Sequence, residues 1–162
     1  MVIASAKNQS AGLLLFRNAD ADRQVLLGHP GGPFWSKKDL GAWTIPKGLI
    51  GPGESPLAAA KREFAEETGH YPNGELVSLG RAKQPGGKIV HVWAVREDWE
   101  VDQPRSNTFE MEWPPKSGRR QTFPELDRAS WFQISDARKK ILKGQAVFID
   151  RLVEALRKTN DN

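Results

Sequence analysis

Residues 48–70 read GLIGPGESPLAAAKREFAEETGH, and this stretch decides the fold. Its central part predicts a helix whose two ends are both marked. The Ser55 hydroxyl can accept a hydrogen bond from a free N–H of the first turn, and Pro56 suits the first helical position because its missing N–H is not needed there. Gly69 can adopt the left-handed conformation that ends a helix without steric cost. The sequence therefore predicts a helix over residues 56–68.

Three carboxylates lie on one side of this predicted helix. Glu63, Glu66 and Glu67 are spaced i, i+3 and i+4, so they project from the same face. Most clusters of this kind are simply solvated surface. Here, however, like charges repel by roughly 0.2–0.5 kcal/mol per pair, and the negative end of the helix dipole disfavours them further. A hard divalent cation would neutralise this charge, so the cluster predicts a site for Mg²⁺ or Mn²⁺.

The loop before the helix favours an anionic ligand. Glycines at positions 48, 51 and 53 permit close backbone approach, and Lys47 brings a mobile cation to the place where a phosphate chain would lie. A Gly/Pro loop by itself is an ordinary connection. Next to a cluster of carboxylates, it indicates a site for a phosphate-containing substrate.

The spacing of these residues resembles the Nudix box, the signature of the MutT-like Nudix hydrolases. The charged and glycine positions of that signature are all present: Gly48, Glu54, Arg62, Glu63, Glu66, Glu67 and Gly69, with Phe64 between them. One position departs from the pattern, because His70 stands where an aliphatic residue is usual. That departure affects the expected local packing and not the expected catalysis.

The resemblance implies a Mg²⁺- or Mn²⁺-dependent hydrolase that cleaves a phosphoanhydride bond in a nucleoside diphosphate linked to another group. It implies that Glu63, Glu66 and Glu67 bind the metal, that the Gly48 carbonyl adds a ligand, that Arg62 orients the glutamates and that Glu54 supports the loop. The metal ions would neutralise charge and position water and leaving group, as phosphoryl chemistry requires. The base that activates water differs between Nudix branches.

Several glutamates are candidates for that base. We favour Glu66, as a metal ligand that helps to activate the water. Glu110, Glu112 and Glu125 are candidates from outside the box.

The residues before the box suggest the substrate. The run from Trp43 to Gly48 is similar to the approach to the box in diadenosine tetraphosphate hydrolases, where a lysine stands at the position of Lys47 and many other Nudix proteins have glycine. This similarity implies a dinucleoside polyphosphate, or another nucleotide with a long phosphate chain, as the substrate.

Aromatic residues could stack on a nucleobase. The candidates are Trp35, Tyr71 and Trp113, although a tryptophan more often belongs to a core. Trp35 is favoured because it lies in a Gly/Pro loop beside Lys37 and Lys38. The other possible phosphate contacts are expected to be structural or merely exposed: His29, His91, Arg119 and Arg120.

Apolar β-prone runs predict strands over the rest of the chain, and amphipathic segments predict two further helices. The expected strands cover residues 11–16, 24–28, 42–45, 75–79, 89–95, 108–113 and 129–132; the expected helices cover residues 135–142 and 145–157; loops are expected at 29–41 and, as a hairpin turn, at 85–87. Mixed strands with helices on their faces predict an α/β/α sandwich with a mixed, Nudix-like sheet.

Composition narrows the class of protein. The chain has 162 residues, of which 38% are hydrophobic, so we expect one soluble domain over residues 1–162. The apolar runs are too short to cross a bilayer, and residues 1–10 lack the apolar stretch of a secretory signal, so the expected compartment is the cytoplasm. The absence of cysteine excludes disulfides and cysteine-ligated zinc.

The formal net charge of +4 favours polyanionic partners such as a nucleotide. The basic residues form no run or helical stripe, so a nucleic-acid groove is not expected. No pattern indicates an oligomeric state.

Two other functions compete with the main hypothesis. One is a housecleaning nucleoside triphosphate pyrophosphatase. The other is a non-catalytic Nudix-like module that binds a nucleotide. The complete set of Arg62 and the three box glutamates argues against the module, because binding alone does not require every metal ligand.

Overall fold

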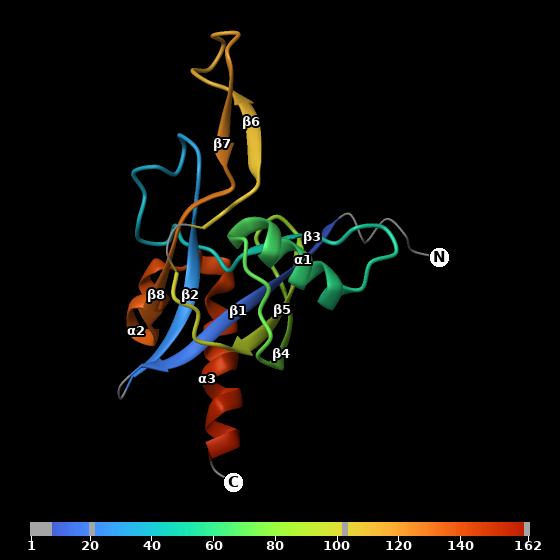
Figure 1. Ribbon diagram of the computed structural model, residues 1–162, viewed down its shortest axis with the longest axis vertical. Coiled ribbons are helices and arrows are strands. Elements are labelled where there is room, and N and C mark those ends of the chain that lie inside the picture. Colours follow the sequence, from blue (N-terminus) through green and yellow to red (C-terminus); the bar gives the residue numbers. More distant parts are fainter. Residues whose placement is uncertain (1–7, 20–21, 102–103, 161–162) are drawn as a thin grey trace.

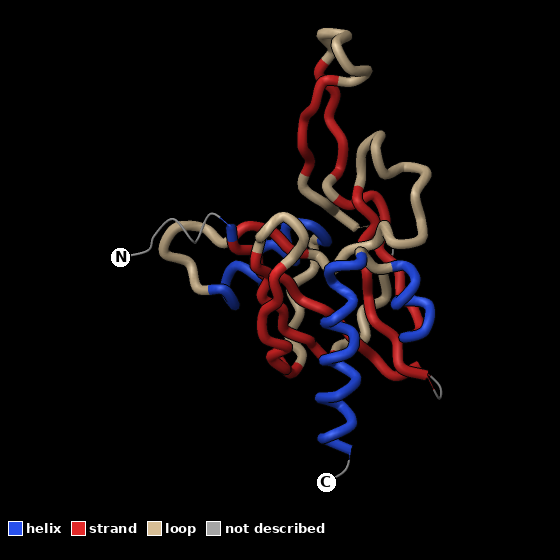
Figure 2. Tube along the Cα trace, turned by 180° about the vertical axis from the view of Figure 1, so that it is seen from behind, coloured by secondary structure: helices blue, strands red, loops and turns tan. Residues whose placement is uncertain are grey.

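The computed structural model describes residues 8–19, 22–101 and 104–160, which form a mixed β-sheet with helices on both faces (Figures 1 and 2). The strands of this sheet are β1 (Gln9–Ala19), β2 (Asp22–Pro30), β3 (Lys47–Leu49), β4 (Glu75–Lys83), β5 (Ile89–Arg96) and β8 (Leu126–Gln133). The strand order is β4-β5-β1-β2-β8, and β3 pairs with β1 beside this order. β1 and β5 run parallel, whereas the other paired neighbours run antiparallel. The mixed α/β sandwich predicted from the sequence is confirmed.

The central strand β1 supplies both hydrophobic layers. The helices that cover the sheet are α1 (Pro56–Thr68), α2 (Ile134–Lys140) and α3 (Ala146–Asn160), with a short 3₁₀ helix at Lys143–Gln145 before α3. Alternate residues of a strand point to opposite faces, so Leu13 and Leu15 pack in the layer of α1 while Leu14 and Phe16 pack in the layer of α3. A strand buried on both faces requires a continuous apolar run.

Helix α1 begins and ends where the sequence predicts. The Ser55 hydroxyl accepts a hydrogen bond from the Ala58 N–H at 3.2 Å. Gly69 adopts a φ of 80°, and its N–H donates to the Ala65 carbonyl. Phe64 lies on the buried face of the helix, and its packing fixes the position of the half-buried glutamates relative to the sheet.

A second sheet of two strands projects from the main one (Figure 1). It pairs β6 (Thr108–Glu112) with β7 (Arg120–Pro124) in antiparallel register. The loop of residues 31–41 lies beside this hairpin (Figure 2). The sequence predicted β6 but not β7, because the residues that begin β7 are polar and exposed and so lack the apolar alternation of a half-buried strand.

The prediction of a strand over residues 42–45 is wrong. Trp43 and Thr44 make single bridges to other segments, and the Ile45 N–H donates to the Gln145 side-chain carbonyl at 2.8 Å. Backbone groups of separate segments bond Trp43 and Thr44, and a side chain bonds the Ile45 N–H, so no continuous strand pairing forms here. The neighbouring strand is β3, which was expected to be loop. β3 can lie against β1 because Gly12 has no side chain: a Cβ there would lie 2.7 Å from the Lys47 Cβ.

The remaining elements agree with the prediction within a few residues. The turn at residues 85–87 joins β4 to β5, and α3 continues to Asn160. The expectation of no secretory signal concerns residues 1–10, of which 1–7 lie outside the described residues. Within the part of the chain that the structure describes, no helix has the length and apolar character needed to cross a membrane.

Candidate active site

Arg62 is the centre of the polar network on α1. Its Nε and Nη2 donate to the two carboxylate oxygens of Glu54 at 2.8 and 2.9 Å. Its Nη1 donates to Glu63 Oε1 at 2.9 Å and to Glu66 Oε2 at 3.1 Å. Nη2 also donates to the Leu49 carbonyl at 3.0 Å. One guanidinium therefore joins the helix, the loop before it and β3.

Glu54 anchors this arrangement from the loop. Its Oε1 accepts a hydrogen bond from the Gly51 N–H at 2.9 Å. The bonds from Arg62 and Gly51 lower the pKa of Glu54 to about 2, because they favour the charged carboxylate. Glu54 thus joins the loop at Gly51 to Arg62 on the helix.

Gly48 and the three box glutamates line one cavity, which we call the acidic cavity. Its volume is about 340 Å³. It is lined by Lys47, Gly48, Leu49, Glu63, Glu66, Glu67, Asn107, Thr108 and Glu125. The structure therefore brings the predicted metal-site residues together with Lys47, and it adds Glu125 from the β7–β8 junction.

Burial shifts the pKa values of several groups that line the acidic cavity. Burial raises the pKa of Glu67 to about 8, and the charges of Glu63 and Glu125 add to this effect. Burial also raises the pKa of Glu63 and of Glu125, and it lowers the pKa of the Lys47 ammonium. Burial thus disfavours the charged forms of these groups, whereas a bound cation would favour the charged carboxylates.

Gly48 is required by the space that Glu63 occupies. A Cβ at position 48 would lie 2.0 Å from the Glu63 carboxyl carbon, so any other residue would displace that carboxylate. Beside it, the Lys47 N–H donates to Glu67 Oε2 at 3.0 Å. The backbone of β3 thus bonds Glu67 and leaves space for the Glu63 carboxylate.

The donors of this cavity suit a hard divalent cation. They are carboxylate and carbonyl oxygens, which Mg²⁺ and Mn²⁺ prefer. Among the residues that the structure describes, no three Asp, Glu or His side chains already converge on one point, and Arg62 bonds both Glu63 and Glu66. The chemistry of the donor set fits a metal, and a cation would compete with Arg62 for these two carboxylates.

A second cavity, the aromatic cavity, adjoins the first. Its volume is about 370 Å³. It is lined by Pro30, Gly31, Gly32, Pro33, Phe34, Trp35, Phe109, Met111 and Glu125. Glu125 lines both cavities. Trp35 is therefore near the site, with the Lys38 ammonium 5.1 Å from its ring centroid, whereas Lys37 is exposed and lines neither cavity.

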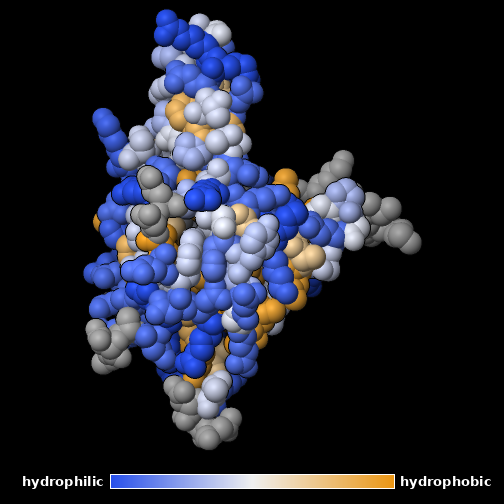
Figure 3. Space-filling view, in the orientation of Figure 1, coloured by the Kyte–Doolittle hydropathy of each residue, from blue (hydrophilic) through white to orange (hydrophobic). Residues whose placement is uncertain are grey.

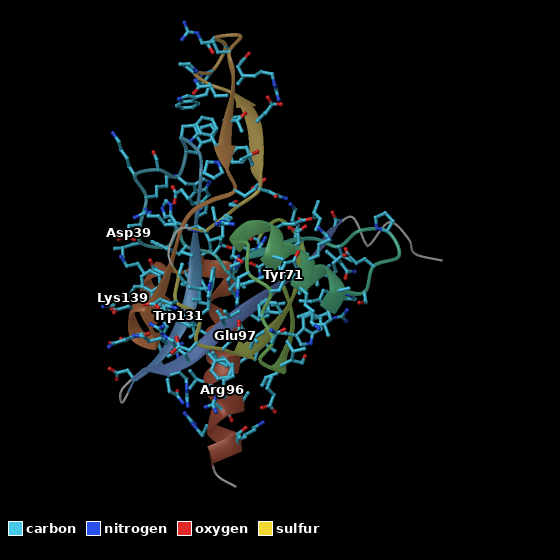
Figure 4. The ribbon with its side chains drawn as sticks, viewed as in Figure 1. Asp39, Tyr71, Arg96, Glu97, Trp131 and Lys139 are labelled. Carbon is cyan, nitrogen blue, oxygen red and sulfur yellow. The ribbon has the colours of Figure 1, made fainter. Side chains whose placement is uncertain are left out.

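The other candidate residues lie away from the acidic cavity. Glu110 and Glu112 are exposed on β6, so Glu125 is the candidate base from outside the box that lines the cavity. Tyr71 is 75% exposed and lies beside α1, below the projecting hairpin (Figure 4). Trp113 packs edge-on against Phe34, with ring centroids 5.3 Å apart.

The two candidate histidines have structural partners. His29 is fully buried, with Nδ1 2.8 Å from Asp127 Oδ1 and Nε2 2.7 Å from the Lys38 carbonyl. His91 Nε2 lies 2.8 Å from Gln9 Oε1. Arg119 and Arg120 are exposed on the hairpin. None of these residues lines the acidic cavity.

His70, which replaces the aliphatic residue of the box pattern, packs against neighbouring side chains. Its ring stacks on Trp99, with centroids 4.5 Å apart and planes 7° apart, and its Nε2 pairs with Glu97. An aromatic stack thus takes the place of the expected aliphatic contact.

The sequence did not predict Asn107 and Thr108 as residues of the site. The Asn107 N–H donates to the Glu66 backbone carbonyl at 2.8 Å, and its carbonyl accepts from the Glu125 N–H at 2.8 Å. This segment therefore ties the end of α1 to the β7–β8 junction. No local sequence signal marks it, because its role depends on contacts far along the chain.

Comparison with known proteins identifies the family. A model of the NUDIX domain matches residues 6–152. The 8-oxo-(d)GTP phosphatase of Mycolicibacterium smegmatis is 32% identical over 114 residues, which are 66% of this chain and 34% of that protein. The chain thus spans about one third of the length of this relative.

Solved structures share the fold. The NUDIX domain of Shewanella oneidensis NrtR, solved with ADP ribose, has a TM-score of 0.65 and 19% identity over 93% of this chain and 89% of that one. A C. elegans Ap4A hydrolase binary complex has a TM-score of 0.64 and 21% identity over 92% of this chain and 98% of that one.

NrtR of Shewanella oneidensis has also been solved with a 27mer DNA, and that structure is 18% identical over 93% of this chain and 63% of that one. At these identities the structural likeness concerns the fold alone. The family match over residues 6–152 shows that this chain belongs to the Nudix family, and Gly48 and the three box glutamates line one cavity as the match would require.

Proposed function

We propose that this protein is a divalent-cation-dependent hydrolase that cleaves a phosphoanhydride bond in a nucleoside diphosphate linked to another group. The observation that carries the proposal is the acidic cavity, where Glu63, Glu66, Glu67 and Glu125 line one space with Lys47. A site that only binds an anionic nucleotide would not favour four carboxylates, because they repel phosphate. Together with a metal they can hold a phosphate chain and direct water to phosphorus.

Each box residue has a proposed role. Glu63, Glu66, Glu67 and the Gly48 carbonyl would hold Mg²⁺ or Mn²⁺, which supplies charge neutralisation and a more acidic water when bound. Arg62 orients Glu63 and Glu66 through its Nη1, and Glu54 holds Arg62. Glu66 helps to remove the proton from water, and Glu125 is the alternative acceptor because it lines the same cavity.

The position of Lys47 favours a substrate with a long phosphate chain. It lines the acidic cavity and also a third cavity of about 400 Å³, the basic cavity. The basic cavity is lined by Ser10, Gly41, Lys47, Gln84, Pro85, Lys88, Val90, Leu142, Lys143, Gly144 and Gln145. Three lysines on this side suit phosphates beyond those held by a metal. We therefore propose a dinucleoside polyphosphate as the substrate, with a nucleoside triphosphate as the second candidate.

An activity panel tests the proposal. Dinucleoside polyphosphates, nucleoside triphosphates and nucleotide sugars would be incubated with Mg²⁺, with Mn²⁺ and with excess chelator, and the products would be identified. We expect hydrolysis with either cation and none in chelator. Full activity in chelator would contradict the metal mechanism. Tight nucleotide binding without turnover on any substrate would favour the non-catalytic module.

A further inference from the structure

The aromatic cavity is built by two segments far apart in the sequence. One wall is the loop of residues 30–35, and the other is Phe109 and Met111 of β6. Phe109 and Met111 are two residues apart, so they point to the same face of the strand. Both are half-buried, and Phe34 is 59% exposed. Apolar and aromatic surface thus lines an open cavity, which is typical of a ligand site.

Two glycines hold the loop against the hairpin. A Cβ on Gly31 would lie 2.0 Å from the Pro124 carbonyl oxygen. Gly32 has a φ of 95°, and a Cβ there would lie 2.9 Å from Phe109 Cζ. The loop backbone therefore lies directly on the base of the hairpin. The width of the cavity is set by contacts that leave no room for side chains at these two positions.

The aromatic cavity continues into the acidic cavity. Glu125 lines both, and along β6 Thr108 lines the acidic cavity while the next residue, Phe109, lines the aromatic one. A ligand with phosphates in the acidic cavity would therefore extend its other end between the loop and the hairpin. The Glu125 carboxylate at the junction can accept hydrogen bonds from N–H groups.

We propose that the aromatic cavity binds the nucleobase of the substrate, and that Phe109 and Met111 contact its ring. This inference rests on the proposed function for the direction of the phosphates. A flat ring with polar edges matches a cavity with aromatic walls and one carboxylate, and stacking on aromatic side chains is the general way in which proteins hold a base. The β6–β7 hairpin is thus the element that selects the base.

Methionine labelling gives a direct test without catalysis. Met111 is one of two methionines in the chain, so ¹³C-methyl labelling gives a simple spectrum in which Met111→Leu assigns the signal. AMP, GMP and ribose 5-phosphate would be added in excess chelator. We expect AMP or GMP to shift the Met111 methyl signal through the ring current of the base. Ribose 5-phosphate at the same concentration should leave it in place.

Binding of the same ligands to variants measures the contribution of the ring. Phe109→Ala should weaken binding of the preferred nucleotide by about tenfold, and Phe109→Leu, which keeps an apolar side chain and protects folding, should weaken it to a similar degree. Thr122→Ala is the matched control, since Thr122 is exposed on β7 and lines neither cavity.

Two results would overturn the proposal. One is a Met111 signal that no nucleotide shifts, or that ribose 5-phosphate shifts equally. The other is full nucleotide affinity in both Phe109 variants. Because these measurements need no turnover, they remain decisive even if no substrate is hydrolysed, whereas hydrolysis with an unchanged Met111 signal would uphold the proposed function and reject the base site.

Discussion

Helix α1 and the β6–β7 hairpin border the same acidic cavity but are built in opposite ways. Helix α1 packs Phe64 into a hydrophobic layer against the sheet, and its polar face is fixed by five bonds from Arg62. The hairpin projects from the sheet (Figure 1), and a space-filling view shows hydrophobic atoms among hydrophilic ones on it (Figure 3).

This difference separates two tasks. Groups that act on the reacting phosphorus must be held within a fraction of an ångström, so they belong on a packed helix. Groups that choose a substrate tolerate a less rigid support and are often carried by projecting segments. We therefore expect changes on α1 to abolish turnover on every substrate, and changes on the hairpin to alter which substrate is used.

The largest expected effect comes from Glu66→Gln. This substitution keeps the size of the side chain and an oxygen that can accept from Arg62, but removes the charge needed for a metal ligand. Turnover with Mg²⁺ should fall by at least about 100-fold, or ~2.7 kcal/mol in the barrier. Steady-state kinetics on the best substrate of the panel measures this, together with melting curves in chelator.

The matched control is Glu110→Gln, because Glu110 is exposed on the hairpin and lines neither cavity. Its turnover should equal that of the wild type. The Glu66 variant should also melt at the same or a higher temperature without metal, since it relieves repulsion between carboxylates. A large loss of metal-free stability in this variant would mean that Glu66 serves the fold.

The same contrast explains how far the sequence could predict the structure. Helix α1 was predicted residue by residue, because its cap at Ser55, its stop at Gly69 and its charge spacing are local signals. Glu125 was one candidate among several, and Asn107 was not predicted at all. These two residues reach the site through backbone bonds to each other and to Glu66, and no local pattern encodes such contacts.

The errors have the same origin. Residues 42–45 have the composition of a strand, but Ile45 binds the Gln145 side chain, which lies about a hundred positions away. Strand β7 lacks apolar alternation because it projects into solvent. Sequence periodicity reports burial, so it fails where a strand is exposed or where a side chain completes the backbone bonds.

A smaller effect is expected at Lys47, which stands between the acidic and the basic cavity. We expect the wild type to cleave dinucleoside tetraphosphates with a higher kcat/KM than triphosphates. Lys47→Met should reduce that preference by about tenfold, ~1.4 kcal/mol, because the ammonium serves the additional phosphates. Methionine keeps the N–H that donates to Glu67, so triphosphates should be less affected.

Lys139→Met is the control for charge, since Lys139 is exposed on α2 (Figure 4). It should retain the wild-type preference. An equal loss of activity on all substrates in the Lys47 variant would show that this lysine serves the reaction centre. A wild type that prefers triphosphates would instead favour the housecleaning pyrophosphatase.

A further effect is expected on the stability of the metal-free protein, and it leaves the chemistry of the reaction aside. Burial raises the pKa of Glu67 from 4.5 to about 8, so between these values the folded chain keeps a proton that the unfolded chain releases. Stability from this group is therefore fully present below about pH 4.5 and is lost as pH rises through 8. In chelator, Tm should be lower at pH 9 than at pH 5, by roughly 2–4 °C for each ~1 kcal/mol lost.

Glu67→Gln isolates this contribution, because glutamine does not titrate while other groups continue to do so. Glu54 does not interfere between pH 5 and pH 9, since its lowered pKa keeps it charged in the folded chain over this range. The variant should lose less Tm than the wild type from pH 5 to pH 9, and the two should differ most at pH 9. Saturating Mg²⁺ should remove most of that difference, because a bound cation favours the charged carboxylate. If Tm changes equally with pH in the wild type and the variant in chelator, the pKa of Glu67 is not raised in the folded chain. The contrast between α1 and the hairpin would then not extend to the electrostatics of the metal-free protein.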